Sequence, residues 1–308
     1  MKCTIGVDIG GTDVKIGKFY GDQLNKKMII KTNKENKGSN ILQDVFKAID
    51  KIVGLDQLEG VGFAIPGPVV KGHILGSENL GWERFDVESE IRMHFKNIDI
   101  YVLNDANAAT VGEMAYGGGK KFKNFVFVTL GTGVGGGVFI NGRLVEGVSG
   151  SAGEIGHLKV NTGNIRRCKC GLYDCLEQYS SATGVVITAN ELRIGRNTKL
   201  NEIDITCERV FDLAKAGDEV ALEVVDEMVH KLSLGLSIVS SVINPEAFVI
   251  GGGVSKSGEF LIEKLRKKFY TYAFYSIENT DFVLAQLGNE AGIYGANYAV
   301  RNKIIWKF

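Results

Sequence analysis

The chain has 308 residues, of which 44% are hydrophobic, enough to bury a large core and to favour two domains over one. Lysine plus arginine and aspartate plus glutamate both number 36, so the formal net charge of zero gives no electrostatic footprint for nucleic acid. No apolar run approaches the roughly 18 residues of a membrane span, and the sequence starts in a strand pattern without a secretory signal. The five cysteines therefore indicate a reducing, cytoplasmic compartment rather than a disulfide framework.

The opening stretch predicts a strand hairpin followed by alternating helices and strands. Residues 3–8 and 14–20 have the pattern of two strands, and a glycine-rich turn joins them. A helix is expected over 40–53, where apolar residues recur at helical spacing. Short strands follow at 60–65 and 99–103. This alternation indicates the α/β class, and the hairpin adds an antiparallel pair, so a mixed sheet is expected.

A second hairpin repeats the first one after a glycine run. The helix predicted from Asp105 ends at Gly117-Gly118-Gly119, which is a candidate interdomain hinge. Residues 124–130 are then a strand, GTGVGG is a turn, and GVFI is the return strand. Asn141-Gly142 predicts a type I′ turn after it. The recurrence of strand, glycine-rich turn and strand indicates an internal duplication.

The last third of the chain begins with a long predicted helix. Asp218 caps this helix over 218–243, and Asn244-Pro245 ends it. A strand then leads into a glycine turn, a basic helix covers 258–270, and the last strand covers 282–286. Strands thus alternate with helices to the end of the chain, as the α/β class requires.

A cluster of metal-ligand residues lies in the middle of the chain. The candidates are one histidine and three of the five cysteines: His157, Cys168, Cys170 and Cys175. This donor set suits a closed tetrahedral zinc site, whereas the alternative is a loop of buried, inert thiols. Because the chain supplies all four ligands, no position is left for a reacting water, and the zinc is expected to be structural. Glu154 and Glu177 bracket the loop, so the chemistry is expected beside it.

The two glycine-rich turns are candidate phosphate sites. GTGVGG contains G-x-G-x-x-G, but a return strand follows it instead of a helix, which rejects the dinucleotide-binding fingerprint. The P-loop motif is absent from the sequence. Each turn offers backbone N–H groups and a threonine, Thr12 or Thr132, and such concave backbone nests bind anions. The alternative is two ordinary hairpins that need positive φ at their glycines.

Two aspartates stand where strands end. Asp8 lies beside the first turn, and in a phosphate site it would hold Mg²⁺ directly or through water. A carboxylate that accepts hydrogen bonds from turn N–H groups is the alternative, and the sequence leaves both open. Asp105 starts a helix, whose positive end favours an ionised carboxylate. It is a candidate catalytic group or a helix N-cap, although Asn104 is also suited to cap.

Together these motifs resemble the ROK sugar kinases (repressors, open reading frames, kinases), which belong to the actin, Hsp70 and hexokinase superfamily. The resemblance covers nearly the whole chain. The segments that match are, in chain order, residues 8–12, 103–113, 131–137, 152–157, 168–177 and 250–255. Asp174 departs from the pattern because the family usually has glycine there, which puts the local turn geometry in question. Asp13 follows the first motif, at a position where the family varies.

The resemblance implies a fold of two ribonuclease-H-like (actin-like ATPase) domains with mixed sheets around a central cleft. A small N-terminal α/β domain would cover residues 1–117. A large α/β domain with the zinc loop would cover 118–291. The final helix, about 292–308, would return to the first domain.

The resemblance also implies residue roles. Asp105 would be the catalytic base, and zinc would be bound by the histidine and three cysteines named above. The sugar would contact Asn79, Asn104, Asp105, Glu154, His157 and Glu177. ATP and its Mg²⁺ would contact Asp8, Gly10, Gly11, Thr12, Gly131, Thr132, Gly133, Gly251, Gly252 and Gly253.

The activity implied is ATP-dependent phosphorylation of a hexose at its 6-hydroxyl, most simply by a glucokinase. The open alternatives are kinases for N-acetylmannosamine, N-acetylglucosamine, allose, fructose or a β-glucoside, and a non-catalytic sugar-sensing ROK protein. A DNA-binding repressor is disfavoured, because the sequence begins at its first strand and carries no net charge. The expected partners are a small hexose and ATP, with no nucleic acid or membrane, and the chain is expected to form a homodimer or homotetramer.

Overall fold

The computed structural model describes residues 1–303, and the chain divides into two compact units. The first unit comprises Met1–Lys121, Gly137–Ala152 and the described residues from Gln286 on. The second comprises Phe122–Gly136 and Gly153–Ala285. Residues 137–152, which were expected in the second domain, thus group with the first unit. Of the final helix expected over 292–308, residues 304–308 lie outside the described residues.

The first unit contains a mixed five-stranded sheet, in the order β3-β2-β1-β4-β8. Strands β1 (Lys2–Ile9), β2 (Asp13–Tyr20) and β3 (Gln23–Lys31) pair antiparallel, and β4 (Gln57–Ile65) and β8 (Asp99–Asn104) continue the sheet in parallel with β1. The predicted mixed sheet is therefore confirmed. Strand β3 was not predicted, because it is a largely exposed edge strand rich in lysine, and such strands lack a clean apolar alternation.

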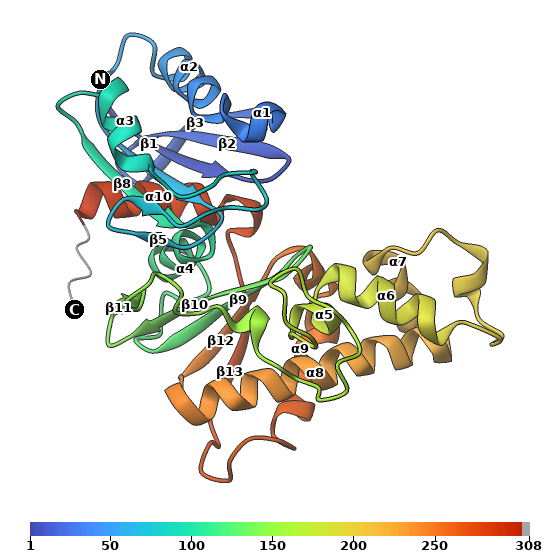
Figure 1. The fold of residues 1–308 in the computed structure, drawn as a ribbon. Coiled ribbons are helices and arrows are strands. Elements are labelled where there is room, and N and C mark those ends of the chain that lie inside the picture. Colours follow the sequence, from blue (N-terminus) through green and yellow to red (C-terminus); the bar gives the residue numbers. More distant parts are fainter. Residues whose placement is uncertain (304–308) are drawn as a thin grey trace. The chain divides into compact units, whose positions relative to one another are not determined.

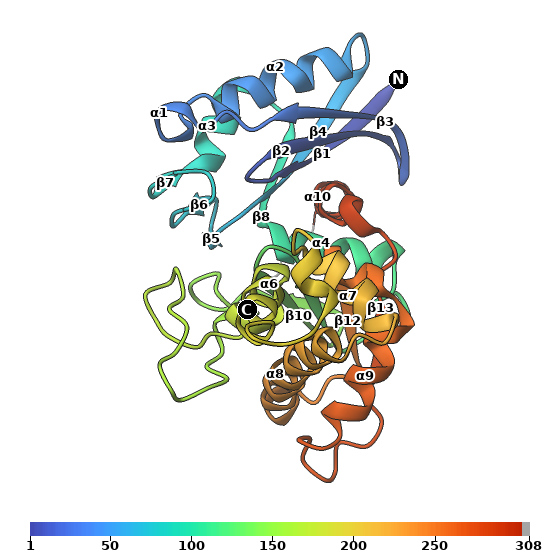
Figure 2. The ribbon, with the colours of Figure 1, turned by 90° about the vertical axis from the view of Figure 1, so that its right-hand side faces the viewer.

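Helices cover both faces of this first sheet (Figures 1 and 2). Helix α2 (Ile41–Val53) confirms the helix predicted over 40–53, and it shares one apolar core with α3 (Val87–His94). On the other face, α10 (Ala291–Asn302) lies between the sheet and α4 (Asp105–Tyr116). Gly6 allows this close approach, since a Cβ there would overlap the carbonyl group of Ile293.

Smaller elements complete the first unit. A three-stranded sheet follows β4 in the chain, and the helical turn α1 precedes α2. Their bounds are α1 (Glu35–Gly38), β5 (Val69–Val70), β6 (His73–Ile74) and β7 (Phe85–Asp86). Two isolated backbone hydrogen bonds pair Ser77 with Trp82, which closes the loop that carries Asn79.

A second five-stranded sheet has the order β11-β10-β9-β12-β13. Its strands are β9 (Phe125–Leu130), β10 (Val134–Ile140), β11 (Arg143–Val145), β12 (Ala247–Gly251) and β13 (Asp281–Leu284). As in the first sheet, three strands that are consecutive in the chain, here β9, β10 and β11, form one side of the sheet. The other side is formed by β12 and β13, which are parallel to β9. The shared order confirms the repeated topology on which the predicted duplication rests. Asn141 and Gly142 both have positive φ, as a type I′ turn requires.

Helices make up most of the second unit. They are α5 (Glu177–Ser180), α6 (Ala182–Leu192), α7 (Cys207–Lys215), α8 (Glu219–Ile243) and α9 (Glu259–Phe269). The 3₁₀ turns of the chain are η1 (Ile155–His157), η2 (Lys199–Glu202), η3 (Gly253–Ser257) and η4 (Gly288–Glu290). The Asp218 carboxylate caps α8 by accepting the Ala221 N–H, as predicted. Among residues 1–303, every helix is too short or too polar to span a bilayer.

Candidate functional site

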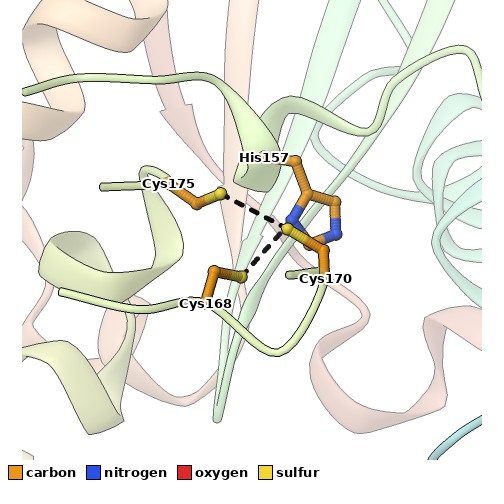
Figure 3. A group of neighbouring side chains, drawn as sticks. All are labelled: His157, Cys168, Cys170 and Cys175. Atoms are coloured by element: carbon orange, nitrogen blue, oxygen red, sulfur yellow. Dashed lines mark hydrogen bonds between the residues drawn. The ribbon is translucent and has the colours of Figure 1, made fainter. Parts of the chain in front are cut away.

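The four predicted metal ligands converge in the second unit (Figure 3). Their donor atoms all lie within 4.8 Å of one another. The Cys170 and Cys175 sulfurs are 3.6 Å apart, and the Cys168 sulfur is 3.8 Å from His157 Nδ1. Tetrahedral zinc with bonds of about 2.3 Å to sulfur places its ligand atoms about 3.7 Å apart. The donor set and its spacing therefore fit a zinc ion.

The loop that carries the cysteines is held by local backbone bonds. The Cys168 N–H donates to the Leu172 carbonyl at 2.8 Å, and the Gly171 N–H donates back to the Cys168 carbonyl at 3.1 Å. Gly171 has a φ of +90°, in the region that favours glycine. The tight turn brings Cys168, Cys170 and Cys175 together without a helix or a strand.

Asp174 explains how this loop tolerates a departure from the family pattern. Its φ of +60° is left-handed, a conformation that aspartate adopts more readily than most residues. The buried carboxylate accepts the N–H groups of Ile165 and Arg166 and the Tyr179 hydroxyl. Although burial acts to raise it, these hydrogen bonds hold the pKa of Asp174 below its usual range. The side chain thus stabilises the turn that a glycine usually forms.

Two of the three cysteines in this loop, Cys168 and Cys175, are buried, whereas Cys170 is exposed. Burial, with the Glu177 carboxylate adding to it, raises the pKa of the Cys168 thiol. Burial also raises the pKa of Cys175 to about 11. Zinc binds thiolates, so the positive charge of a bound cation is what would keep these buried sulfurs deprotonated.

Both predicted glutamates border the metal-ligand cluster. One Glu177 oxygen accepts a hydrogen bond from the Cys168 thiol at 3.0 Å. Its other oxygen lies 2.7 Å from the position that a Cβ on Gly133 would take, so a side chain there would have to displace the Glu177 carboxylate. The Glu154 carboxylate is 3.9 Å from His157 Nε2, while His157 Nδ1 faces Cys168. The imidazole therefore has one nitrogen for the cluster and the other beside Glu154.

In the first unit, Asn104 caps α4 and leaves Asp105 as the first helical residue. Asn104 Oδ1 accepts the Asn107 N–H, and its Nδ2 donates to the Gly67 carbonyl, both at 3.1 Å. Asp105 is half-buried, and one of its oxygens accepts the Ala106 N–H at 2.8 Å. The interpretation of Asn104 as the cap is confirmed. Asp105 lies in the first helical turn, where the positive helix end favours a negative charge.

The first glycine-rich turn does not depend on positive φ. Neither Gly10 nor Gly11 has one, so a need for positive φ does not explain the glycines of this turn. A Cβ on Gly11 would meet Lys34 Nζ at 3.4 Å and the Asn79 carbonyl at 3.5 Å. The turn therefore adjoins the loop of Asn79, another predicted sugar-binding residue.

The Asp8 carboxylate is paired with a lysine. Lys15 stands opposite Asp8 in the β1–β2 register, and its Nζ is 3.0 Å from Oδ2. Within residues 1–303, Asp8 accepts no hydrogen bond from the turn N–H groups, so that alternative is not observed. Neither Lys15 nor Lys34 was identified from the sequence as a candidate site residue. Lys15 could have been predicted from the hairpin, because the pairing of β1 with β2 places it directly opposite Asp8.

The second turn and the strand end at β12 lie side by side. Gly131 and Gly133 also lack positive φ, whereas Gly252 has a φ of +83°. A Cβ on Gly252 would lie 2.5 Å from the Leu130 carbonyl oxygen, just before the second turn. Gly131 and Gly253 have no atom within 4 Å of their Cβ positions. These two glycines therefore leave open space at the backbone.

The predicted sugar-binding residues thus fall into two groups, one in each unit. The first unit holds Asn79, Asn104 and Asp105, and the second holds Glu154, His157 and Glu177. Each group contains at least one carboxylate and one side chain that donates hydrogen bonds. Such groups suit a ring of hydroxyls, each of which donates and accepts.

The ROK family model matches residues 4–303. The chain belongs to the ROK family. A relative named glucokinase, from Halalkalibacterium halodurans, is 36% identical over 97% of this chain and 95% of that protein. A solved ROK glucokinase from Streptomyces griseus, in complex with glucose and AMPPNP, has a TM-score of 0.82 at 29% identity, covering 97% of this chain and 99% of that one. A xylose repressor from Caldicellulosiruptor bescii is 28% identical over 94% of this chain and 76% of that protein.

Proposed function

We propose that this ROK protein transfers the γ-phosphoryl group of ATP to the 6-hydroxyl of a hexose, most simply glucose. The similarity to glucokinases over nearly the whole chain supports this activity. The observation that carries the catalytic assignment is the start of α4, where Asn104 caps the helix and the half-buried Asp105 is the first helical residue. The positive end of the helix favours the ionised carboxylate that a general base needs.

Asp105 acts as the general base. The sugar O6 attacks the γ-phosphorus, a new O–P bond forms, and the bond from phosphorus to the β–γ bridging oxygen breaks. The proton of the hydroxyl passes to Asp105, and ADP leaves with the bridging oxygen. Phosphoryl transfer has a loose transition state, so the protein mainly positions the reactants and neutralises charge.

The glycine-rich turns bind the ATP phosphates. The turns at Gly10-Gly11-Thr12 and Gly131-Thr132-Gly133 supply N–H groups, and their glycines do not need positive φ. The open Cβ position of Gly253, in the Gly251–Gly253 segment, suits the close approach of the adenosine. Asp8 would hold the Mg²⁺ that would neutralise charge on the phosphates, and Lys15, which pairs with Asp8, adds a cation at the same turn.

Glu154, His157 and Glu177 recognise the sugar hydroxyls, together with Asn79 and Asn104. The contact of Glu177 with Cys168, and of Glu154 with His157, supports a link between the metal loop and this role. Zinc would have a structural role: His157, Cys168, Cys170 and Cys175 would hold it, and it would order the loop. The family resemblance favours a homodimer or homotetramer, and the use of three of the five cysteines as metal ligands favours a reducing, cytoplasmic compartment.

A coupled assay of ADP release tests the proposal. Purified protein with Mg·ATP is offered glucose, N-acetylmannosamine, N-acetylglucosamine, allose, fructose and a β-glucoside. We expect turnover with glucose and a 6-phosphate product by NMR. Turnover with only one of the other sugars would identify that sugar, and not glucose, as the substrate. A 1-phosphate product would contradict the proposal that the 6-hydroxyl lies beside Asp105.

Binding without turnover for every sugar would instead support the non-catalytic sensor. The similarity to a xylose repressor makes this the second candidate. Calorimetric titration of the same sugars, without nucleotide, separates binding from catalysis. The retained Asp105 favours the kinase over the sensor.

A further inference from the structure

A fully buried glutamate near the end of α4 has no role in the activity proposed above. Glu113 has an exposed fraction of 0%, and its carboxylate accepts three backbone N–H groups. The Gly118 N–H lies 2.7 Å from Oε2. The Leu287 N–H lies 2.8 Å from Oε1, and the Gln286 N–H lies 3.0 Å from Oε2. Hydrogen bonds to an ionised group are stronger than neutral ones, so this carboxylate firmly fixes the segments that it holds.

The three donors lie where the chain passes between the two units. The first passage follows Lys121, soon after Gly118. The last passage ends at Gln286, the first residue that returns to the first unit. One carboxylate therefore holds two connecting segments, although Glu113 and Gln286 are 173 residues apart in the sequence. All of these contacts lie inside the first unit.

The glycine run predicted as a hinge is shaped by this same carboxylate. A Cβ on Gly117 would overlap Glu113 Oε2, so the chain can pass the carboxylate only with glycine at this position. A Cβ on Gly137, the first residue of another passage, would overlap the hydroxyl of Thr110. Both Thr110 and Glu113 belong to α4. The chain changes unit after Lys121, before Gly137 and before Gln286, and a residue of α4 contacts the chain near each of these three points.

We propose that Glu113 is a positioning residue for phosphoryl transfer, which acts through α4 and the connecting segments. The inference rests on the proposed function, because the first residue of α4 is Asp105. Along a rigid helix, Asp105 and Glu113 are about 12 Å apart. Loosening the segments at Glu113 displaces the helix, and a displacement of about 1 Å at the reacting group can reduce turnover by about 100-fold.

The test is Glu113→Gln, which keeps the size of the side chain but replaces one accepting oxygen with a donating amide. The new amide group would face backbone N–H donors and cannot accept a hydrogen bond from them, so at least one of the three hydrogen bonds is lost. We expect the amide hydrogens of Gly118, Gln286 and Leu287 to exchange at least about 10-fold faster with solvent. We expect kcat to fall at least about 10-fold, with KM for glucose and for ATP changed less than about 3-fold.

Glu246→Gln is the matched control. The exposed Glu246 carboxylate accepts the N–H groups of Lys123 and Asn124, so it binds the first connecting segment from the second unit. The chemical change is the same, but Glu246 contacts neither α4 nor the returning segment in any hydrogen bond of residues 1–303. We expect its kcat to stay within about twofold of the wild type.

Glu113→Asp provides a second variant if the glutamine variant does not fold. It keeps the charge but is shorter by one methylene, so it cannot reach both segments. In either folded variant, a kcat within twofold of the wild type despite faster amide exchange would overturn the inference, and so would unchanged exchange. If instead Asp105→Asn turns over like the wild type, the catalytic assignment itself fails, independently of the exchange data on Glu113.

Discussion

The two five-stranded sheets have the same strand order but different chemistry at corresponding positions. The last but one residue of the first strand is Asp8 in β1 and Thr129 in β9. After the fifth strand, the first sheet continues into Asp105 and α4, whereas β13 is followed by Ala285. Ionisable groups are therefore gathered on the first sheet, and the second presents glycines at its strand ends. The two sheets thus share their strand order and differ in the chemistry at these strand ends.

The glycines of the two hairpins also differ in what they accommodate. In the first turn, Gly11 adjoins Lys34 and the loop of Asn79. In the second, Gly133 makes room for Glu177, which in turn contacts the metal-ligand cluster. The first turn thus faces a cation and the second faces a carboxylate. We expect the first half to supply charge for catalysis and the second to supply the metal-ordered surface for recognition.

The largest expected effect is loss of the metal from the second unit. Cys170→Ser removes one ligand from the cluster, and we expect about one zinc per wild-type chain and none in the variant. Because zinc binding contributes to folding, the variant should unfold several kcal/mol more easily in the second unit. Cys207→Ser, outside the cluster, should keep its zinc. Metal analysis of wild-type protein purified without chelator that detects no zinc would refute the site.

The next largest effect should arise on the first sheet. Asp105→Asn keeps the shape of the side chain but cannot accept a proton, so kcat should fall at least about 100-fold, or about 2.7 kcal/mol. Sugar binding should persist, because the variant still offers hydrogen bonds. Asp99→Asn, at the exposed start of the same strand, is the control. Turnover of the Asp105 variant within a few-fold of the wild type would mean that another group is the base.

The recognition role of the second unit is tested by its glutamates. Glu154→Ala and Glu177→Ala should each lower kcat/KM for the sugar by at least about 1.5 kcal/mol, because a buried hydroxyl loses its partner. The affinity for ATP should change little. Glu208→Ala, an exposed glutamate on α7, serves as the control. If both variants retain zinc and near-wild-type kinetics, the metal loop does not shape the sugar site.

The smallest effect should come from the strand end at β12. Gly253→Val places a side chain in open space and should raise KM for ATP about fivefold, or about 1 kcal/mol, without changing KM for the sugar. Gly252→Val is the informative contrast, because its positive φ and its proximity to the Leu130 backbone predict failure to fold. Equal changes in both KM values for Gly253→Val would indicate a general distortion instead.

Features that depend on neighbouring residues could be predicted from the sequence. The metal-ligand cluster has three of its four members within eight residues, and their spacing and chemistry are visible in the chain itself. The caps at Asn104 and Asp218 and the turn at Asn141-Gly142 are likewise local. Their energies come from hydrogen bonds and φ preferences within a few residues, so the sequence by itself determined them.

Features that depend on distant partners were decided only by the tertiary structure. Helices α6 and α7 were not predicted, because their short apolar stripes acquire meaning only against α8. Glu113 resembles any helical glutamate in the sequence, yet its partners include backbone N–H groups more than 170 residues away. Backbone donors have no sequence signature. The role of this carboxylate therefore follows from the fold, which brings the distant returning segment to the same helix end as the nearby Gly118.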